Sequence, residues 1–496
     1  MNQIPFNNRY VTLGEQFYVK TKPTPVADPA LIKFNDDLAG ALGLSISASS
    51  SVDITALFSG NVIPDGAEPL AMAYAGHQFG GFNPQLGDGR AILLGEIDSA
   101  SGKSYQIHFK GSGQTHFSRN GDGRSALGPV LREYLVSEAM DKLGVPTTRA
   151  LAAVTTGEEV AREQLVAGGV ITRVATSFVR VGTFQYFSSK GDVEAIQKLA
   201  DFVIERNYPK VSGAENPYAD LLQAVVNAQA SLIARWMQLG FIHGVMNTDN
   251  MSIAGETIDY GPCAFMDHYQ HDRVFSSIDR DGRYAYNNQP SIGLWNLTRL
   301  AESLLPLLAD ETEAGVEVAK GILETYAEAY QRAWLDGMQT KCGLLDVSDK
   351  TVHQDKSLID TLLDAMAENN ADFTLTFYHL SQLNSQPSER DKTIRSLFDD
   401  PTQFDDWVAS WRKRLRDETC SDEVRQEKMQ SVNPVYIPRN HQIEAAIRAA
   451  EDHNDFTVFH ELHAVLQNPY VRQEDKDRYM LPPEPHEVVQ QTFCGT

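Results

Sequence analysis

The chain has 496 residues, of which 42% are hydrophobic and 22% are charged, and its formal net charge is −23. These proportions are typical of a soluble globular protein, while the acidic balance argues against nucleic acid or an anionic membrane surface as partners. The sequence has no apolar run of about 18 residues, and its N-terminus has neither a hydrophobic signal core nor an Arg-rich transit segment. We therefore expect a cytoplasmic protein that does not span a membrane.

The first part of the chain divides into an extension and a strand-rich lobe. Residues 1–70 mix turns with one short helix, expected near 31–42, and we interpret them as an N-terminal extension. Residues 71–190 carry β-like runs separated by turns, together with one helix whose apolar residues recur at four-residue spacing. The strands are expected at 91–97, 104–110 and across 148–187, and the helix at 127–143.

The second part of the chain is predicted to be mainly helical, from 191 to 480, with a short tail at 481–496. Periodic apolar patterns predict helices at 192–206, 217–240, 293–308, 313–336 and 355–368. The polar stretch 384–406 is predicted to be a surface loop. Strands followed by helices indicate an α+β fold with two lobes, the helical C-terminal lobe being the larger.

A motif in the helical part resembles part of a protein kinase active site. The segment HGVMNTDN begins at His243, and the triplet DYG begins at Asp259. Protein kinases have His-Arg-Asp, four residues, Asn and then Asp-Phe-Gly, in which the first Asp is the base and the Asn and second Asp bind magnesium. Here Val245 stands at the position of the base, whereas Asn250 and Asp259 stand at the ligand positions. The chain should bind a nucleotide and magnesium without performing ordinary kinase chemistry.

A glycine-rich turn precedes the first strand of the strand-rich lobe. Gly87 and Gly89 would let backbone N–H groups approach phosphates closely, and Arg90 would add a positive charge. The same Gly-Asp-Gly segment also has the composition of an ordinary hairpin turn, so by itself it does not establish a phosphate site.

A lysine and a glutamate follow in the order found in kinases. Lys110 ends a predicted strand, where kinases keep a phosphate-binding lysine, and Glu133 lies on the next predicted helix, where kinases keep its partner. Glu138 is a rival partner about 140° round the same helix. A lysine that ends a strand is usually only solvated, so the kinase-like interpretation depends on the order of the whole set.

The chain resembles the selenoprotein O (YdiU-like) family, whose members are kinase-like protein adenylyltransferases. The resemblance covers essentially the whole chain in order, and its motifs are long and unusual. They include YAGHQFG at 74–80, PQLGDGRAILLGE at 84–96, FKGSGQT at 109–115, SRNGDGRSALGPVLREYLVSEAM at 118–140, ITRVATSFVRVGTFQYF at 171–187, HGVMNTDNMSI at 243–253, DYGPCAFMD at 259–267, YNNQPSIGLWNLTRLA at 286–301 and NPVYIPRNHQIEAAI at 433–447.

The resemblance implies a role for each matching residue. In the family the nucleotide is inverted relative to a kinase, so that its α-phosphate faces the protein substrate. The implied ATP-binding residues are Gly87, Gly89, Arg90, Lys110 (oriented by Glu133), Asp122 and Gly123 at the adenosine end, Arg173 and Arg180 at the outer phosphates, and Asp259; Asn250 and Asp259 are the implied magnesium ligands, and Asp249 the proton acceptor.

These roles agree with the chemistry of the residues, although each residue also has an ordinary interpretation. Two arginines can bind a pyrophosphate leaving group with forked donors, which lysine lacks. Arg173 and Arg180 could instead form surface salt bridges. Asp249 could accept a hydroxyl proton, or it could cap a turn.

The C-terminus departs from the family pattern. Eukaryotic members carry selenocysteine third from the end with a cysteine three residues before it. Here Cys494 is third from the end and Gln491 occupies the partner position, so a local dithiol cannot form. Any redox role of Cys494 would need a remote partner such as Cys263, Cys342 or Cys420, or another molecule. A plain cysteine points to a bacterial-type member.

The sequence thus predicts a protein adenylyltransferase that uses ATP and magnesium, or manganese, to modify Ser, Thr or Tyr hydroxyls of proteins. We expect it to act as a monomer. Three alternatives stay open at this point: a phosphotransferase, a UMP transferase that uses manganese, and a nucleotide-binding scaffold without activity.

Overall fold

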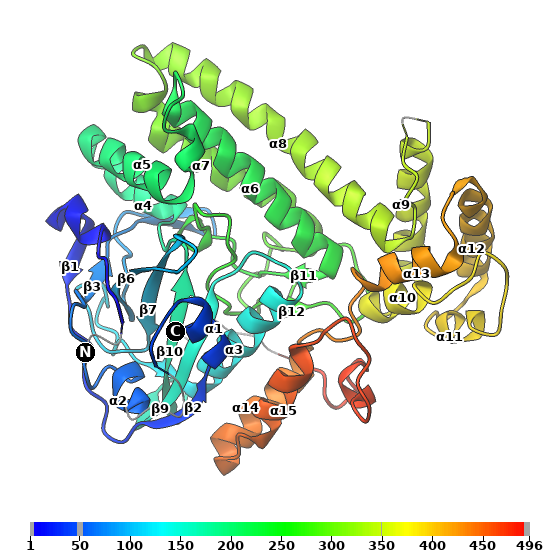
Figure 1. Cartoon of the computed structure of the whole chain (residues 1–496), viewed down its shortest axis with the longest axis horizontal. Coiled ribbons are helices and arrows are strands. Elements are labelled where there is room, and N and C mark those ends of the chain that lie inside the picture. The colour runs from blue at the N-terminus through cyan, green and yellow to red at the C-terminus, as the bar shows by residue number, and fades with distance from the viewer. Residues whose placement is uncertain (1–3, 47–52, 349, 491–496) are drawn as a thin grey trace.

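The N-terminal part of the protein is built on an eight-stranded antiparallel sheet (Figure 1), seen in a computed structural model that describes residues 4–46, 53–348 and 350–490. The strand order is β1-β3-β6-β7-β10-β9-β2, and β8 pairs with β10. The strands of this sheet are β1 Tyr18–Lys20, β2 Ala30–Phe34, β3 Leu70–Met72, β6 Ala91–Asp98, β7 Ser104–Lys110, β8 Ser125–Ala126, β9 Arg149–Ala161 and β10 Leu165–Ala175.

Both faces of the sheet are covered, and the alternation of side chains along each strand assigns residues to one face or the other. On one face, Ile107 and Phe109 of β7 pack in a core with the short helices α1 (Asp36–Ala41) and α2 (Ile54–Phe58). On the other face lies α3 (Leu127–Lys142), which packs against β9 and β10. The intervening residues of β7, such as His108, therefore point toward α3.

Helices dominate the rest of the protein. The long helices α6 and α8 pack side by side, and α9 to α13 form a separate group at one end (Figure 1). The helices are α4 Val181–Ser188, α5 Val193–Asn207, α6 Pro217–Leu239, α7 Gln289–Leu308, α8 Thr312–Lys341, α9 Val352–Glu368, α10 Phe373–Leu380, α11 Asp391–Arg395, α12 Thr402–Arg414, α13 Asp422–Gln430, α14 Asn440–His453 and α15 Thr457–Leu466. None of the helices in the described ranges is both long and apolar enough to cross a membrane.

Two small hairpins lie outside the main sheet. β4 (Gly76–Gln78) pairs with β5 (Gly81–Asn83), and β11 (Phe241–Ile242) pairs with β12 (Ala264–Phe265). The second hairpin encloses the segment from His243 to Asp259, so its two strands bring the ends of that segment together.

The expected α+β class is confirmed, and so are the strands at 91–97 and 104–110, the helix at 127–143 and all five long helices of the second part. Helix α6 shows why such predictions succeed. The Asn216 side chain accepts a hydrogen bond from the N–H of Ala219 at its start, and Gly240 ends it with φ 69°, which are ordinary start and stop signals.

Three expectations were wrong in part. The helix expected at 31–42 is confined to α1, because residues 30–34 pair with β9 as strand β2. The strands expected up to 187 end at β10, and 181–188 is helix α4, whose residues are buried almost all round and so show no polar face. The loop expected at 384–406 contains α11 and the start of α12, which buries Phe404 and Trp407.

Candidate functional site

A pocket of about 780 Å³ lies between the sheet, α3 and the loop that follows β11. It collects every site residue predicted from the sequence except Cys494, which lies outside the described residues. The predicted residues that line it are Gly87, Gly89, Arg90, Lys110, Asp122, Gly123, Glu133, Arg173, Arg180, Asp249, Asn250 and Asp259.

The sheet and α3 together position a lysine, an arginine and a glutamate. Lys110 of β7 lies opposite Ile171 of β10, and Arg173 lies two residues further along β10, so both long side chains project to the α3 face. There Glu133 accepts from Lys110 Nζ at 2.6 Å and from Arg173 Nη1 at 3.2 Å. The rival Glu138 is bound instead by Arg149, at 2.7 Å.

Asp259 is the point where three cations meet. Its Oδ1 accepts from Arg173 Nη1 at 2.7 Å and from Lys110 Nζ at 3.4 Å, and its Oδ2 accepts from Arg180 Nη2 at 3.3 Å. Burial raises the pKa of Asp259, but Arg173, Lys110 and Arg180 together outweigh burial and hold that pKa well below its usual range. Its φ of 58° is uncommon for a residue with a side chain, which is a feature often found at functional sites.

Arg180 enters the site from the start of α4. Its Nη1 donates to Asp88 Oδ1 at 3.3 Å, and its guanidinium lies 4.4 Å above the ring of Tyr74. The side chain of Arg180 is only 2% exposed, so this arginine is not the surface salt-bridge residue that the sequence alone allowed.

The loop after β11 carries the acidic and amide residues of the motif. His243 Nε2 donates to the carbonyl of Ile258 at 2.9 Å and so ties the loop to the DYG triplet. Asn250 Nδ2 donates to the carbonyl of Val245 at 3.0 Å. Val245 itself is buried and apolar, and it cannot accept a proton.

Asp249 is buried with one oxygen bound and one unpartnered. Its Oδ2 accepts from Gln78 Nε2 at 3.1 Å, while Oδ1 has no hydrogen-bond partner among the described residues. Burial raises the pKa of Asp249 to about 6. Gly76 lies so close that a Cβ there would be 2.4 Å from Asp249 Oδ1, so only glycine leaves this carboxylate in place.

Sequence reasoning missed the β4–β5 hairpin, which is bound to the motif loop. His77 N donates to Thr248 Oγ1 at 2.7 Å, and Phe79 N donates to Asn247 Oδ1 at 3.2 Å. These partners are far apart in the sequence, and no local pattern around 76–83 points to them.

Sequence reasoning also missed Asp88 and His108. Asp88 is the middle residue of the Gly-Asp-Gly turn and accepts from Arg180, while His108 lies on β7 two residues before Lys110. The available signal was the run of polar side chains at 106, 108 and 110, on one face of a strand whose other face is apolar.

The glycine-rich turns form the remaining walls. Gly87 has φ 66°, and a Cβ there would lie 2.2 Å from the ring of Phe117. Gly123 has φ 68° and packs as closely on Gly113. At this more exposed end Asp122 pairs with Arg162 at 2.8 Å.

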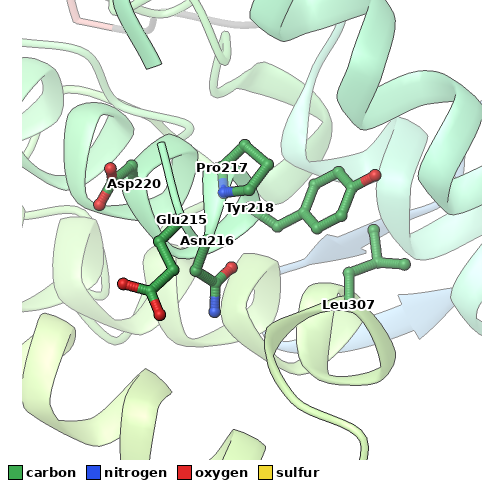
Figure 2. A pocket seen from close by; sticks show the side chains of 6 residues that line it. All are labelled: Glu215, Asn216, Pro217, Tyr218, Asp220 and Leu307. Atoms are coloured by element: carbon green, nitrogen blue, oxygen red, sulfur yellow. The ribbon is translucent and has the colours of Figure 1, made fainter. Parts of the chain in front are cut away.

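A second hollow, of about 610 Å³, lies where α6 begins (Figure 2). Its charged side chains are the carboxylates of Glu215 and Asp220, so it offers no cation to a phosphate. It is lined by Glu215, Asn216, Pro217, Tyr218, Asp220 and Leu307.

The main pocket has oxygen atoms suited to a divalent cation. The nitrogen of the Asn250 amide is used by Val245, which leaves its oxygen as the possible ligand beside the carboxylate of Asp259. Within the described ranges no group of three or more His, Cys, Asp and Glu side chains could hold a metal ion. A cation here would therefore complete its shell with water and nucleotide oxygens, as magnesium commonly does.

The cysteines proposed as remote partners of Cys494 differ in accessibility. Cys263 and Cys342 are buried, and burial raises the pKa of Cys342 to about 12. Cys420 is half-buried, which makes it the most accessible thiol of the three.

The chain is similar throughout its length to known proteins. Residues 1–467 match the family described as "Protein adenylyltransferase SelO". Proteins named "Protein nucleotidyltransferase YdiU" are 56% identical over 492 residues in Rhodopseudomonas palustris (strain BisB5), with 99% of each chain covered, and 55% identical over 496 residues in Rhizobium meliloti (strain 1021), with 100% of each covered. The chain belongs to the SelO family of nucleotidyltransferase enzymes.

Proposed function

We propose that this enzyme is a protein adenylyltransferase with a kinase-like two-lobed fold, which moves AMP from ATP to Ser, Thr or Tyr hydroxyls and releases pyrophosphate. The observation that carries the proposal is the convergence of Lys110, Arg173 and Arg180 on one carboxylate inside a pocket. Three buried cations can bind a polyphosphate, and they suit a leaving group such as pyrophosphate, whose negative charge increases during the reaction.

The two arginines are assigned to the outer phosphates. A planar guanidinium can donate two parallel hydrogen bonds to phosphate oxygens, and it stays charged in a buried site. Lys110, held by Glu133, binds the same phosphates. With the outer phosphates bound at this end, the α-phosphate faces the acceptor hydroxyl, which is the inverted orientation that the family implies.

Asp249 is assigned as the proton acceptor. It is buried, and its Oδ1 has no hydrogen-bond partner among the described residues, so the carboxylate has an unused acceptor. Val245, at the position of the kinase base, cannot take this role. A general base must reach the proton that it removes, and Asp249 lines the same pocket as the arginines.

Asn250 and Asp259 would hold magnesium or manganese through oxygen atoms, which both ions prefer. The bound cation would neutralise phosphate charge and polarise the phosphorus under attack. Gly87, Gly89 and Arg90 are assigned to the phosphates, and Asp122 and Gly123 to the adenosine end.

The wider organisation follows the same proposal. Residues 1–70 are the extension, whose strands β1 and β2 belong to the same sheet as the strands of the N-terminal lobe at 71–190. Residues 191–480 are the C-terminal lobe, and 481–496 are the tail with the redox candidate Cys494. The enzyme is proposed to act as a monomer. Its partners would be cytoplasmic proteins.

The test is a pair of incubations of the full chain with magnesium and a cell lysate. One contains ATP labelled at the α-phosphate, and the other contains ATP labelled at the γ-phosphate. Protein labelled from the α position alone supports adenylyl transfer, whereas protein labelled from the γ position alone contradicts it and indicates a kinase. A parallel incubation with α-labelled UTP and manganese distinguishes uridylyl transfer.

A further inference from the structure

A buried acid–histidine pair connects the two arginines of the pocket. His108 Nδ1 lies 2.8 Å from Arg173 Nη2, and His108 Nε2 lies 3.0 Å from Asp88 Oδ2. The other oxygen of Asp88 accepts from Arg180 Nη1 at 3.3 Å. The side chains of Asp88 and His108 are 1% and 0% exposed, so these four residues form one continuous chain of hydrogen bonds shielded from water.

The direction of these hydrogen bonds is fixed by chemistry. An arginine can only donate, so Nδ1 of His108 must accept from Arg173. The proton of the neutral imidazole is therefore on Nε2, which donates to Asp88. Burial lowers the pKa of His108 to about 4, against the opposing effect of Asp88, and this keeps the ring neutral.

The connection does not depend on Asp259. Both arginines also contact Asp259, but this carboxylate is a proposed metal ligand, and a ligand oxygen given to a cation is lost to the arginines. Arg180 would then keep Asp88 and the ring of Tyr74, and Arg173 would keep His108 and Glu133. The acid–histidine pair therefore joins one arginine to the other whether Asp259 binds a cation or binds the arginines.

We infer that Asp88 and His108 are positioning residues, which fix the spacing and orientation of Arg173 and Arg180 for the two outer phosphates of the nucleotide. This inference rests on the proposed function and deepens it. Removal of the outer-shell partners of metal ligands commonly costs about 10- to 100-fold in affinity or activity, and we expect an effect of similar size for these partners of the phosphate-binding arginines. Neither residue is expected to contact the nucleobase or the α-phosphate.

A purely structural role is the alternative to be excluded. Asp88 also accepts from the backbone N–H of Met72 at 3.1 Å, and His108 stacks on Phe178 with 4.3 Å between the ring centres. If Asp88 and His108 served only these structural contacts, their removal would weaken the binding of all ligands alike or would only destabilise the fold. Ligands with and without outer phosphates distinguish the two roles.

The experiment measures the binding of ATP, pyrophosphate and AMP, each with magnesium, to the full chain by titration calorimetry. His108→Leu is expected to lower the affinity for ATP and pyrophosphate about 10- to 100-fold. Its affinity for AMP should stay within about twofold of wild type, because AMP has no outer phosphates. Equal weakening of all three ligands, or no weakening of pyrophosphate, would overturn the inference.

A matched control lies two residues away on the same strand face. Gln106 is as buried as His108, and its side chain bonds the N–H of Phe178 at 2.6 Å and Glu96 at 3.3 Å, not an arginine. Gln106→Leu should lower the melting temperature, and it should change the affinities for pyrophosphate and AMP by similar factors. If Gln106→Leu also weakened pyrophosphate binding more than AMP binding, the selective loss in His108→Leu would be assigned to general loosening of the strand.

Two further variants keep the test decisive if His108→Leu does not fold. Asp88→Asn is isosteric and removes the charge that faces Arg180, so it should weaken pyrophosphate selectively. His108→Gln retains one donor and one acceptor and should restore part of the affinity. If wild-type protein transfers no α-label while the selective weakening holds, the proposed function fails and the positioning role stands; the reverse pattern rejects only the positioning role.

Discussion

Two groups of buried arginines, one among the C-terminal helices and one in the pocket, differ in how their hydrogen-bond donors are satisfied. Among the C-terminal helices, Arg414 Nε donates to Asp355 at 2.7 Å and its Nη1 donates to Glu418 at 2.8 Å. Arg439 Nε donates to the carbonyl of Met480 at 3.0 Å. These guanidinium groups direct their donors to partners that belong to the fold.

In the pocket, each of the two arginines has one N–H donor without a partner among the described residues. The buried Nε atoms of Arg173 and Arg180 have no hydrogen-bond partner among the residues that the structure describes. They share the carboxylate of Asp259, which is 21% exposed, whereas Asp355 is 0% exposed.

An unpartnered donor alone does not identify a site, since Arg425 Nε in the helical region has none either. Arg173 and Arg180 differ from the arginines of the helical region in combining three features. They have unpartnered donors, they share a partly exposed carboxylate, and they line the same pocket. We expect substitutions in the first region to lower stability, and substitutions in the pocket to lower activity.

The largest expected effect is that of Asp259→Asn. The change removes the charge that the three cations share and weakens the proposed metal site, so nucleotidyl transfer should fall about 1000-fold. Glu133 and Asp88 still partner the cations, and the melting temperature should change little. Transfer from α-labelled ATP and thermal unfolding measure the two effects, and an active Asp259→Asn enzyme would contradict the metal assignment.

Asp355→Asn should have the opposite profile. It neutralises one of the two buried carboxylates that pair with Arg414 and leaves Glu418 as the other, so the free energy of unfolding should fall by less than the roughly 3–5 kcal/mol that breaking a buried pair costs. Urea unfolding measures this loss. The transfer rate per folded molecule should match wild type, and a lower rate would show that the two regions are coupled.

Arg173→Lys tests the fork of donors rather than the charge. Lysine keeps the positive charge but cannot donate in the parallel geometry, and loss of a hydrogen bond to a charged group should lower kcat/KM about 10- to 100-fold. Arg414→Lys is the matched control, which should lose stability and retain activity. Equal kinetics for Arg173→Lys and wild type would mean that charge alone suffices.

The smallest effect concerns pH and His108. The pKa of this residue is about 4 in the folded protein against 6.5 for an ordinary histidine, so the unfolded chain takes up the proton first. Its contribution to stability is complete above pH 6.5 and is lost as the pH falls toward 4, by roughly 1 kcal/mol per pH unit.

His108→Gln removes this titration while leaving the other histidines unchanged. The difference in unfolding free energy between wild type and His108→Gln should therefore shrink between pH 7 and pH 5.5, as measured by urea unfolding. Parallel stability curves would show that His108 is not buried as a neutral ring.

The elements with strong periodicity could be predicted from the sequence, and those defined by distant partners could not. Strand β7 alternates cleanly, and α6 carries its own start and stop signals. Residues 30–34 become a strand only because β9 lies beside them. Helix α4 buries both its faces, so its aromatic and β-branched residues resembled a strand.

The candidate site divides in the same way. The order and spacing of four site residues can be recognised along the linear sequence, namely Lys110, Glu133, Asn250 and Asp259. The roles of Asp88 and His108 depend on β7 and β10 lying in register, with Arg173 directly opposite His108. No spacing along the chain encodes that neighbour.

The contact between the β4–β5 hairpin and the motif loop also affects how the chain is made. His77 and Gln78 bond to residues that follow them by 171 positions. During synthesis the hairpin must wait for that whole length to leave the ribosome, because long-range contacts form late. A nascent or prematurely ended chain that lacks residue 249 therefore has no complete pocket, and transfer cannot begin before about the first half of the 496-residue chain has been made and folded.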